Sequence, residues 1–67
     1  MIRYPVISTR IASVGYQDEI LEIQFKDGAI YHYYNVSLNT YNWFINSPSL
    51  GHSLSILTKK HCYQRIS

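Results

Sequence analysis

The residues of this chain that could do chemistry are its aromatic rings and its cations. The 67 residues include seven tyrosines, two phenylalanines and one tryptophan, more rings than a core of this size can bury. Exposed rings can stack on nucleic-acid bases, which is worth about 1–3 kcal/mol per base, or they can form an oligomer interface. Cations beside them would then meet phosphate groups. The cations suited to this role are Arg3, Arg10, Lys59, Lys60 and Arg65.

The other reactive side chains do not form a catalytic or metal-binding pattern. His32, His52 and His61 lack the spacing of metal ligands, and neither H-E-x-x-H nor C-x-x-C occurs. Neither a G-x-S-x-G elbow nor a phosphate-binding G-x-x-x-x-G-K-[ST] loop is present. Cys62 lies beside His61 and near several cations, which can activate a thiol, but no third group orients the pair. We therefore predict a protein that is not an enzyme and that uses no metal or cofactor.

The charge count favours a small anion over a long nucleic acid. The chain has six lysines and arginines against four acids, a net charge of +2. A strong nucleic-acid binder neutralises several phosphates at once, whereas a nucleotide needs only two or three cations. All four acids lie between residues 18 and 27, where we expect them to be solvated on the sheet. The basic last nine residues predict either a solvated helix or a short anion-attracting patch.

Residues 47–53, Ser-Pro-Ser-Leu-Gly-His-Ser, give a weaker indication of an anion site. Hydroxyl groups and free backbone N–H groups at the start of a helix suit a phosphate, and Gly51 would let a ligand approach the backbone. The simpler interpretation, which we favour, is a loop in which Ser49 or Ser53 caps a helix.

The elements that must position these residues are strands followed by helices. Residues 9–16 and 20–26 alternate apolar and polar side chains, as strands do. Asp27-Gly28 predicts a tight turn, and residues 29–35 form the returning strand of a hairpin. Residues 63–66 are expected to add a short edge strand.

The length of the hairpin loop decides which face carries its tyrosines. A two-residue turn would pair Leu21 with Tyr34 and turn Tyr33 outward. A three-residue bulged loop would pair Leu21 with Tyr33 and turn Tyr33 to the core, with Tyr31 following it. The two-residue turn also buries His32, whose polar ring would need a hydrogen-bond partner. We therefore favour the bulged loop, which turns His32 outward.

Helical periodicity replaces strand alternation in the second half of the chain. Apolar residues recur there at intervals of three and four, as on one face of a helix: Leu38, Tyr41, Phe44 and Ile45. Ser37 is the expected N-cap, and Ser47-Pro48 ends this helix. After a loop over residues 49–53, a second short helix carries Leu54 and Leu57.

Length and composition indicate one small domain that associates. We predict an α+β fold over residues 1–67, in which a small antiparallel sheet of three strands gains a fourth short C-terminal edge strand and carries two short helices on one face. A chain of this length hides only about 60% of its unfolded surface on folding. Since only 15% of the residues are charged, much of the outside is apolar, and we expect a homo-oligomer.

The expected setting is the cytoplasm. A single cysteine permits no internal disulfide, which fits a reducing compartment. No basic start followed by an apolar run opens the sequence, and no stretch approaches about 18 apolar residues. We therefore expect neither export nor a membrane partner.

A pattern spread over almost the whole chain resembles a known family. Its central mark is the strand Tyr31-His32-Tyr33, which follows Phe25 and Gly28 in the spacing Phe-x-x-Gly. The residues that carry the pattern are Ser8, Thr9, Ile11, Val14, Gly15, Tyr16, Leu21, Ile23, Phe25, Gly28, Tyr31, His32, Tyr33, Val36, Tyr41, Phe44, Ser49, Gly51, Lys59, Arg65 and Ile66. Together they resemble the KTSC domain, a family named for the C-terminal segment of some lysyl-tRNA synthetases that also occurs as free-standing bacterial and phage proteins. The resemblance supports the α+β fold far more than a function; the family has no established activity, and RNA binding has been suggested for it.

Three functions remain open at this stage. We favour a non-enzymatic homo-oligomer that binds and sequesters a nucleotide-type small molecule in a pocket at or near a subunit interface, such as a phage protein that captures a nucleotide immune signal. The alternatives are an RNA-binding module and a protein-interaction domain. The predicted ligand-binding residues are His32, Tyr34, Trp43, His52, Ser53, Lys59, Lys60 and Arg65.

Overall fold

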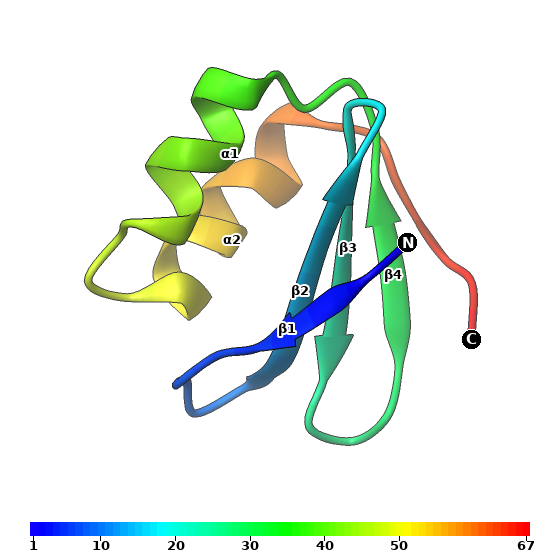
Figure 1. The fold of residues 1–67 in the computed structure, drawn as a ribbon, viewed down its shortest axis with the longest axis vertical. Helices are drawn as coiled ribbons and strands as arrows, with labels where there is room; N and C mark the ends of the chain where they lie inside the picture. The colour runs from blue at the N-terminus through cyan, green and yellow to red at the C-terminus, as the bar shows by residue number, and fades with distance from the viewer.

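The computed structural model describes all 67 residues as a five-stranded antiparallel sheet with two helices on one face (Figure 1). The sheet order is β1-β2-β3-β4-β5, so neighbouring strands in the sheet are also consecutive strands in the chain. The α+β prediction is confirmed, and the sheet has one strand more than expected. The elements are β1 (Arg3–Pro5), β2 (Ile11–Gln17), β3 (Ile20–Phe25), β4 (Ile30–Tyr33), α1 (Leu38–Ile45), α2 (Leu50–Lys60) and β5 (Tyr63–Arg65).

The hairpin between β3 and β4 has the bulged register that the sequence favours. Leu21 pairs with Tyr33 rather than with the next residue. In the loop, the Asp27 carboxylate accepts a hydrogen bond from the Ala29 N–H at 3.0 Å, and Gly28 has a φ of 96°, which glycine adopts without strain. Tyr33 therefore points to the core and is only 3% exposed.

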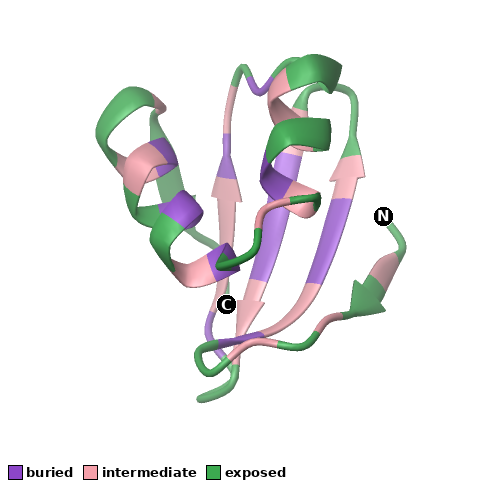
Figure 2. Cartoon of the chain, turned by 90° about the vertical axis from the view of Figure 1, so that its left-hand side faces the viewer, coloured by how far each residue is buried: buried purple, intermediate pink, exposed green.

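The hydrophobic core lies between the sheet and the two helices (Figure 2). Strand alternation brings apolar side chains to the helix-bearing face, and the helices cover them. Of the predicted helix face, Phe44 is fully buried, but Leu38 is 60% exposed because it is the first residue of α1. The buried cluster consists of Ile11, Val14, Leu21, Ile23, Tyr33, Val36, Phe44, Leu50, Leu54 and Leu57.

Serine side chains begin both helices. Ser37 caps α1 and Ser49 caps α2, and each hydroxyl oxygen accepts the backbone N–H three residues later. Because Ser49 is already the cap, α2 starts at Leu50, and the predicted loop over residues 49–53 is wrong beyond its first residue. Neither helix is long and apolar enough to cross a membrane.

The first seventeen residues require two further corrections. β1 was not predicted, because three residues that include Pro5 are too few to show alternation. β2 begins at Ile11 and not at residue 9, since residues 9–10 form a bend. This bend takes Arg10 out of the strand and leaves its side chain free to reach α2.

Candidate ligand-binding site

A cleft opens between α2 and the sheet on the helix-bearing face. Its volume is about 370 Å³, within the range of small-molecule sites. We call it the α2 cleft. Its lining residues are Arg10, Phe25, Tyr33, Leu54, Ser55, Thr58 and Lys59.

The α2 cleft contains two cations and no acid. Arg10 is held in place by Nη2, which donates to the Gly51 carbonyl at 2.8 Å. A Cβ at position 51 would lie 3.2 Å from this guanidinium, so glycine leaves the room that the contact needs. Ser55 and Lys59 follow Gly51 at intervals of four and therefore share its face of α2. Neither Arg10 nor Lys59 forms an ion pair within the chain, which leaves both available to an anion.

Aromatic rings continue the floor of the cleft toward β5. The Tyr33 ring stacks on Tyr63 with centroids 5.4 Å apart, and Tyr31 lies 6.1 Å from Tyr63. Phe25 meets Tyr31 edge-on at 5.6 Å. Because Tyr63 is 48% exposed, its ring presents apolar surface next to Tyr33, which lines the cleft.

The hydroxyl of Tyr33 is a fixed polar group of the cleft. It shares a hydrogen bond with the Thr58 hydroxyl at 3.1 Å, and Thr58 in turn donates to the Leu54 carbonyl at 2.9 Å. Burial raises the pKa of Tyr33 above its ordinary value, so this hydroxyl is protonated at neutral pH. The cleft thus offers neutral hydroxyls as well as cations to a bound molecule.

The opposite, helix-free face of the sheet carries a paired charge cluster. Arg3, Gly15, Glu22 and His32 occupy one cross-strand row over β1 to β4. The Glu22 carboxylate accepts from Arg3 Nη1 at 2.7 Å and from His32 Nε2 at 2.7 Å. Gly15 has no side chain between Arg3 and Glu22, so the arginine can cross its strand. We call these three side chains the Arg3–Glu22–His32 cluster.

Burial of Glu22 corrects the expectation that all four acids are solvated. Its side chain is 9% exposed. Burial alone would disfavour the carboxylate, but hydrogen bonds from His32 and Arg3 outweigh this effect and hold the pKa of Glu22 below its ordinary value. The cluster therefore keeps a charged carboxylate covered by Arg3 and His32 on the helix-free face of the sheet.

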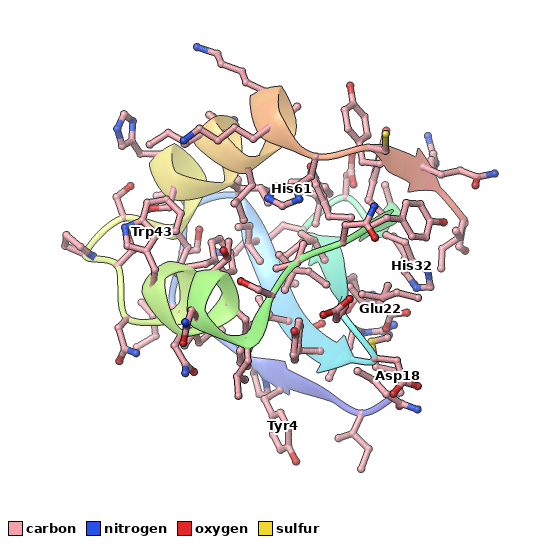
Figure 3. All side chains as sticks on the ribbon, turned by 90° about the horizontal axis from the view of Figure 1, so that it is seen from above. Tyr4, Asp18, Glu22, His32, Trp43 and His61 are labelled. Carbon is pink, nitrogen blue, oxygen red and sulfur yellow. The ribbon has the colours of Figure 1, made fainter.

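The predicted ligand-binding residues do not gather at one place. Lys59 lines the α2 cleft, and Arg65 lies on β5 at the edge of the sheet. Trp43 and Lys60 line a second, smaller cleft of about 220 Å³ between the helices, together with His61. Trp43 lies on the other side of the molecule from the cluster on the helix-free face (Figure 3).

The remaining predicted residues line none of the clefts in the structure. His32 and Tyr34 are on the helix-free face with ring centroids 6.2 Å apart, and His32 is already bonded to Glu22. His52 is exposed in the first turn of α2. Ser53 is only 3% exposed, and its hydroxyl hydrogen-bonds that of Ser47, so it serves packing rather than a surface site.

Several residues of the α2 cleft were not among the predicted ligand contacts. Ser55 and Lys59 both lie within the predicted second helix, but Gly51, which shares their face of α2, was assigned to the preceding loop. Arg10 contacts Gly51 across 41 positions, a separation that local periodicity cannot show. Tyr33 was assigned to the core, where its ring does lie, although its hydroxyl reaches the cleft. No group of three histidine, cysteine or acidic side chains is placed to hold a metal ion.

Comparison with known proteins identifies the family. A family model of the KTSC domain matches residues 7–60. The chain belongs to the KTSC domain family. The crystal structure of a KTSC domain protein from Yersinia pestis matches with a TM-score of 0.90 at 33% identity, covering 98% of this chain and 97% of that one. A search of curated proteins finds no match.

The α2 cleft belongs to the part of the KTSC domain that the family model describes. Arg10 and Lys59 both lie within residues 7–60. β1 and β5 lie outside these residues, although the structural match to the Yersinia protein is long enough to include them. The sequence-based family assignment and its fold are confirmed.

Proposed function

We propose that this KTSC domain binds a small nucleotide-type molecule in the α2 cleft, as a homo-oligomer and without converting it. The observation that carries the proposal is the placement of Arg10 and Lys59, two cations without acidic partners, beside an aromatic floor. The two features match the two ends of a nucleotide, which carries an anionic phosphate and a flat base.

The phosphate would lie between Arg10 and Lys59. One Arg10 nitrogen is used by the Gly51 carbonyl, and the other guanidinium N–H groups remain free to donate. Hydrogen bonds between charged groups are stronger than neutral ones, and guanidinium can bind phosphate through two of them. The hydroxyl of Ser55 lies on the same side of α2 and can add a neutral donor.

The base would stack on the rings that continue the cleft toward β5. Tyr63 is the exposed member of this floor and already stacks on Tyr33. A base placed on such a ring gains about 1–3 kcal/mol. The cleft volume of about 370 Å³ lies near the lower end for small-molecule sites, which favours one nucleotide unit over a strand of RNA.

The lining residues support binding without conversion. They include no carboxylate and no imidazole that could act as a general base. A protein that only binds its ligand acts by lowering the ligand's free concentration, which fits capture of a nucleotide immune signal.

The surface supports association of several copies. Eight large apolar side chains are exposed on a chain of 67 residues, and four of them lie within the first seven residues. They are Met1, Ile2, Tyr4, Ile7, Leu38, Trp43, Tyr63 and Ile66.

Calorimetric titration with adenosine monophosphate, inorganic phosphate and a single-stranded RNA tests the proposal. We expect adenosine monophosphate to bind more tightly than phosphate and to remain bound at moderate salt, because contacts inside a cleft are poorly screened. Lys59→Gln should weaken nucleotide binding about tenfold, the loss of one charge-assisted contact. Lys60→Gln is the matched control, since Lys60 neighbours Lys59 but lines the other cleft. Tight, salt-sensitive RNA binding with no response to the nucleotide would contradict the proposal and favour an RNA-binding module.

A further inference from the structure

The two edges of the sheet differ in their capacity to pair with another strand. On the β1 edge, the Val6 N–H donates to the Ala12 carbonyl. The backbone N–H and C=O groups of alternate residues therefore point toward β2, and the backbone of Pro5 points away from the sheet. Proline has no N–H to offer, which blocks strand addition at that edge. On the β5 edge, the Ile66 N–H donates to the Ile30 carbonyl at 2.8 Å. The backbone N–H and C=O groups of Tyr63 and Arg65 therefore point away from β4, toward solvent.

We propose that β5 pairs with β5 of a second copy, antiparallel and about a two-fold axis at Gln64. In this register Tyr63 of each chain lies opposite Arg65 of the other, and their outward N–H and C=O groups form the hydrogen-bonded pairs. Gln64 lies opposite Gln64 of the second copy as a non-hydrogen-bonded pair. The two-fold symmetry makes one strand edge complementary to itself, as in most homodimers.

The side chains also match across this register. Tyr63 pairs with Tyr33 and Arg65 with Tyr31 within the sheet, so both side chains lie on the helix-bearing face. The Arg65 guanidinium donates through Nε to the main-chain oxygen of Ser67 and forms no ion pair with an Asp or Glu side chain. Opposite the half-exposed ring of Tyr63, it gains a cation–π contact, and the two arginines do not face each other.

The pairing would extend the candidate ligand site. β5 lies on the side of the sheet away from α1 (Figure 1), so α1 of each copy stays clear of a junction at this edge, whereas α2, which leads into β5, lies near it. Arg65 of the second copy then lies beside Tyr63, whose ring continues the floor of the α2 cleft. This contribution to ligand binding rests on the proposed nucleotide function, whereas the strand pairing itself does not.

A disulfide between chains tests the register directly. Non-hydrogen-bonded antiparallel pairs have Cα atoms about 4.5 Å apart, within the range of disulfides. We expect Gln64→Cys, in a Cys62→Ser background, to form a covalent dimer under mild oxidation at least about tenfold faster than Gln17→Cys in the same background. Gln17 is an exposed glutamine at the far end of β2 and serves as the matched control. Equal rates for the two variants would overturn the proposal.

A second variant separates association from ligand binding. Arg65→Pro removes a backbone N–H that points away from β4 and forms no bond to it. We therefore expect the sedimenting mass to fall from that of two chains to that of one, while the circular dichroism spectrum stays unchanged. Nucleotide binding should then weaken but persist through Arg10 and Lys59. A wild-type dimer that binds no nucleotide contradicts the proposed function and leaves the interface standing. A wild-type protein that sediments as one chain and still binds nucleotide contradicts the interface and the homo-oligomer, and leaves nucleotide binding in the α2 cleft standing.

Discussion

The two faces of the sheet both carry basic side chains, which have an acidic partner on one face and none on the other. On the helix-free face, Arg3 and His32 are both bonded to the buried Glu22 carboxylate. In the α2 cleft, Arg10 and Lys59 lie near aromatic rings and have no acidic partner. A cation that is already paired contributes to stability, while an unpaired one at an open cleft can bind an anion. The comparison shows that the candidate site is located by the convergence of two unpaired cations on one cleft beside aromatic rings, rather than by the number of cations in the chain.

The largest expected effect concerns the floor of the cleft. Tyr33→Ala should lower the free energy of unfolding by about 3 kcal/mol or more, because it removes a large buried ring. Tyr33→Phe keeps the ring and loses only the contact with Thr58, for about 1 kcal/mol. Urea unfolding measures both changes. Similar losses for the two variants would mean that the hydroxyl, and not the ring, stabilises this site.

Glu22→Gln should lower the stability of the protein without changing its affinity for a nucleotide. It removes the charge that Arg3 and His32 share, and we expect a loss of about 2 kcal/mol, typical for hydrogen bonds to a charged group. Nucleotide affinity should stay within about twofold of the wild type, since the α2 cleft lies on the other face. A large loss of affinity at unchanged stability would reverse the roles given to the two regions.

Lowering the pH should remove the stability that Glu22 contributes on the helix-free face. The folded pKa of Glu22 lies below its value in the unfolded chain, so the unfolded state binds the proton more readily. The stability that this carboxylate contributes is complete above its ordinary pKa of about 4.5 and is lost as the pH falls through the lower folded value. Thermal melts of the wild type and Glu22→Gln between neutral and acidic pH should converge. Parallel curves would show that Glu22 is not the group responsible.

Gly15→Ala should have the smallest effect on the free energy of unfolding. The new Cβ would lie 2.7 Å from the Ile2 carbonyl and close to the Arg3 side chain, so β1 must shift. We expect a loss of about 1 kcal/mol, as for mild overpacking, together with weaker contact between Arg3 and Glu22. Ligand binding in the α2 cleft should be unchanged in calorimetry, whereas a change there would show that β1 and the cleft are coupled.

The sequence predicted the parts of the fold that depend on local chemistry. Asp27-Gly28 indicated the hairpin, the cost of burying His32 favoured the correct register, and Ser37 was the correct cap of α1. β1 could not be predicted, because its stability comes from pairing with β2 and not from its own three residues. The start of α2 was misplaced because Ser49 and Ser53 are equally good caps in the sequence, and only packing distinguishes them.

The candidate site was predictable to a smaller extent. Lys59 was identified because the basic end of the chain is visible as composition. The partners of Arg10 and Glu22 lie 41 and 19 positions away, so neither the free cation nor the paired acid could be distinguished in the sequence. Alternation placed Glu22 on the outer face correctly, but it could not show that Arg3 and His32 would cover it there.

The order of the strands bears on how quickly each part of the protein forms. β1 to β4 pair across short connections, whereas both helices lie between β4 and β5. Closing that longer loop costs more chain entropy, so β5 should join the sheet late in folding and detach first. The N–H of Ile66, bonded to the Ile30 carbonyl, should therefore exchange with solvent faster than the amides of β3. A second copy paired at β5 would slow that exchange, and protection of this strand would then depend on protein concentration.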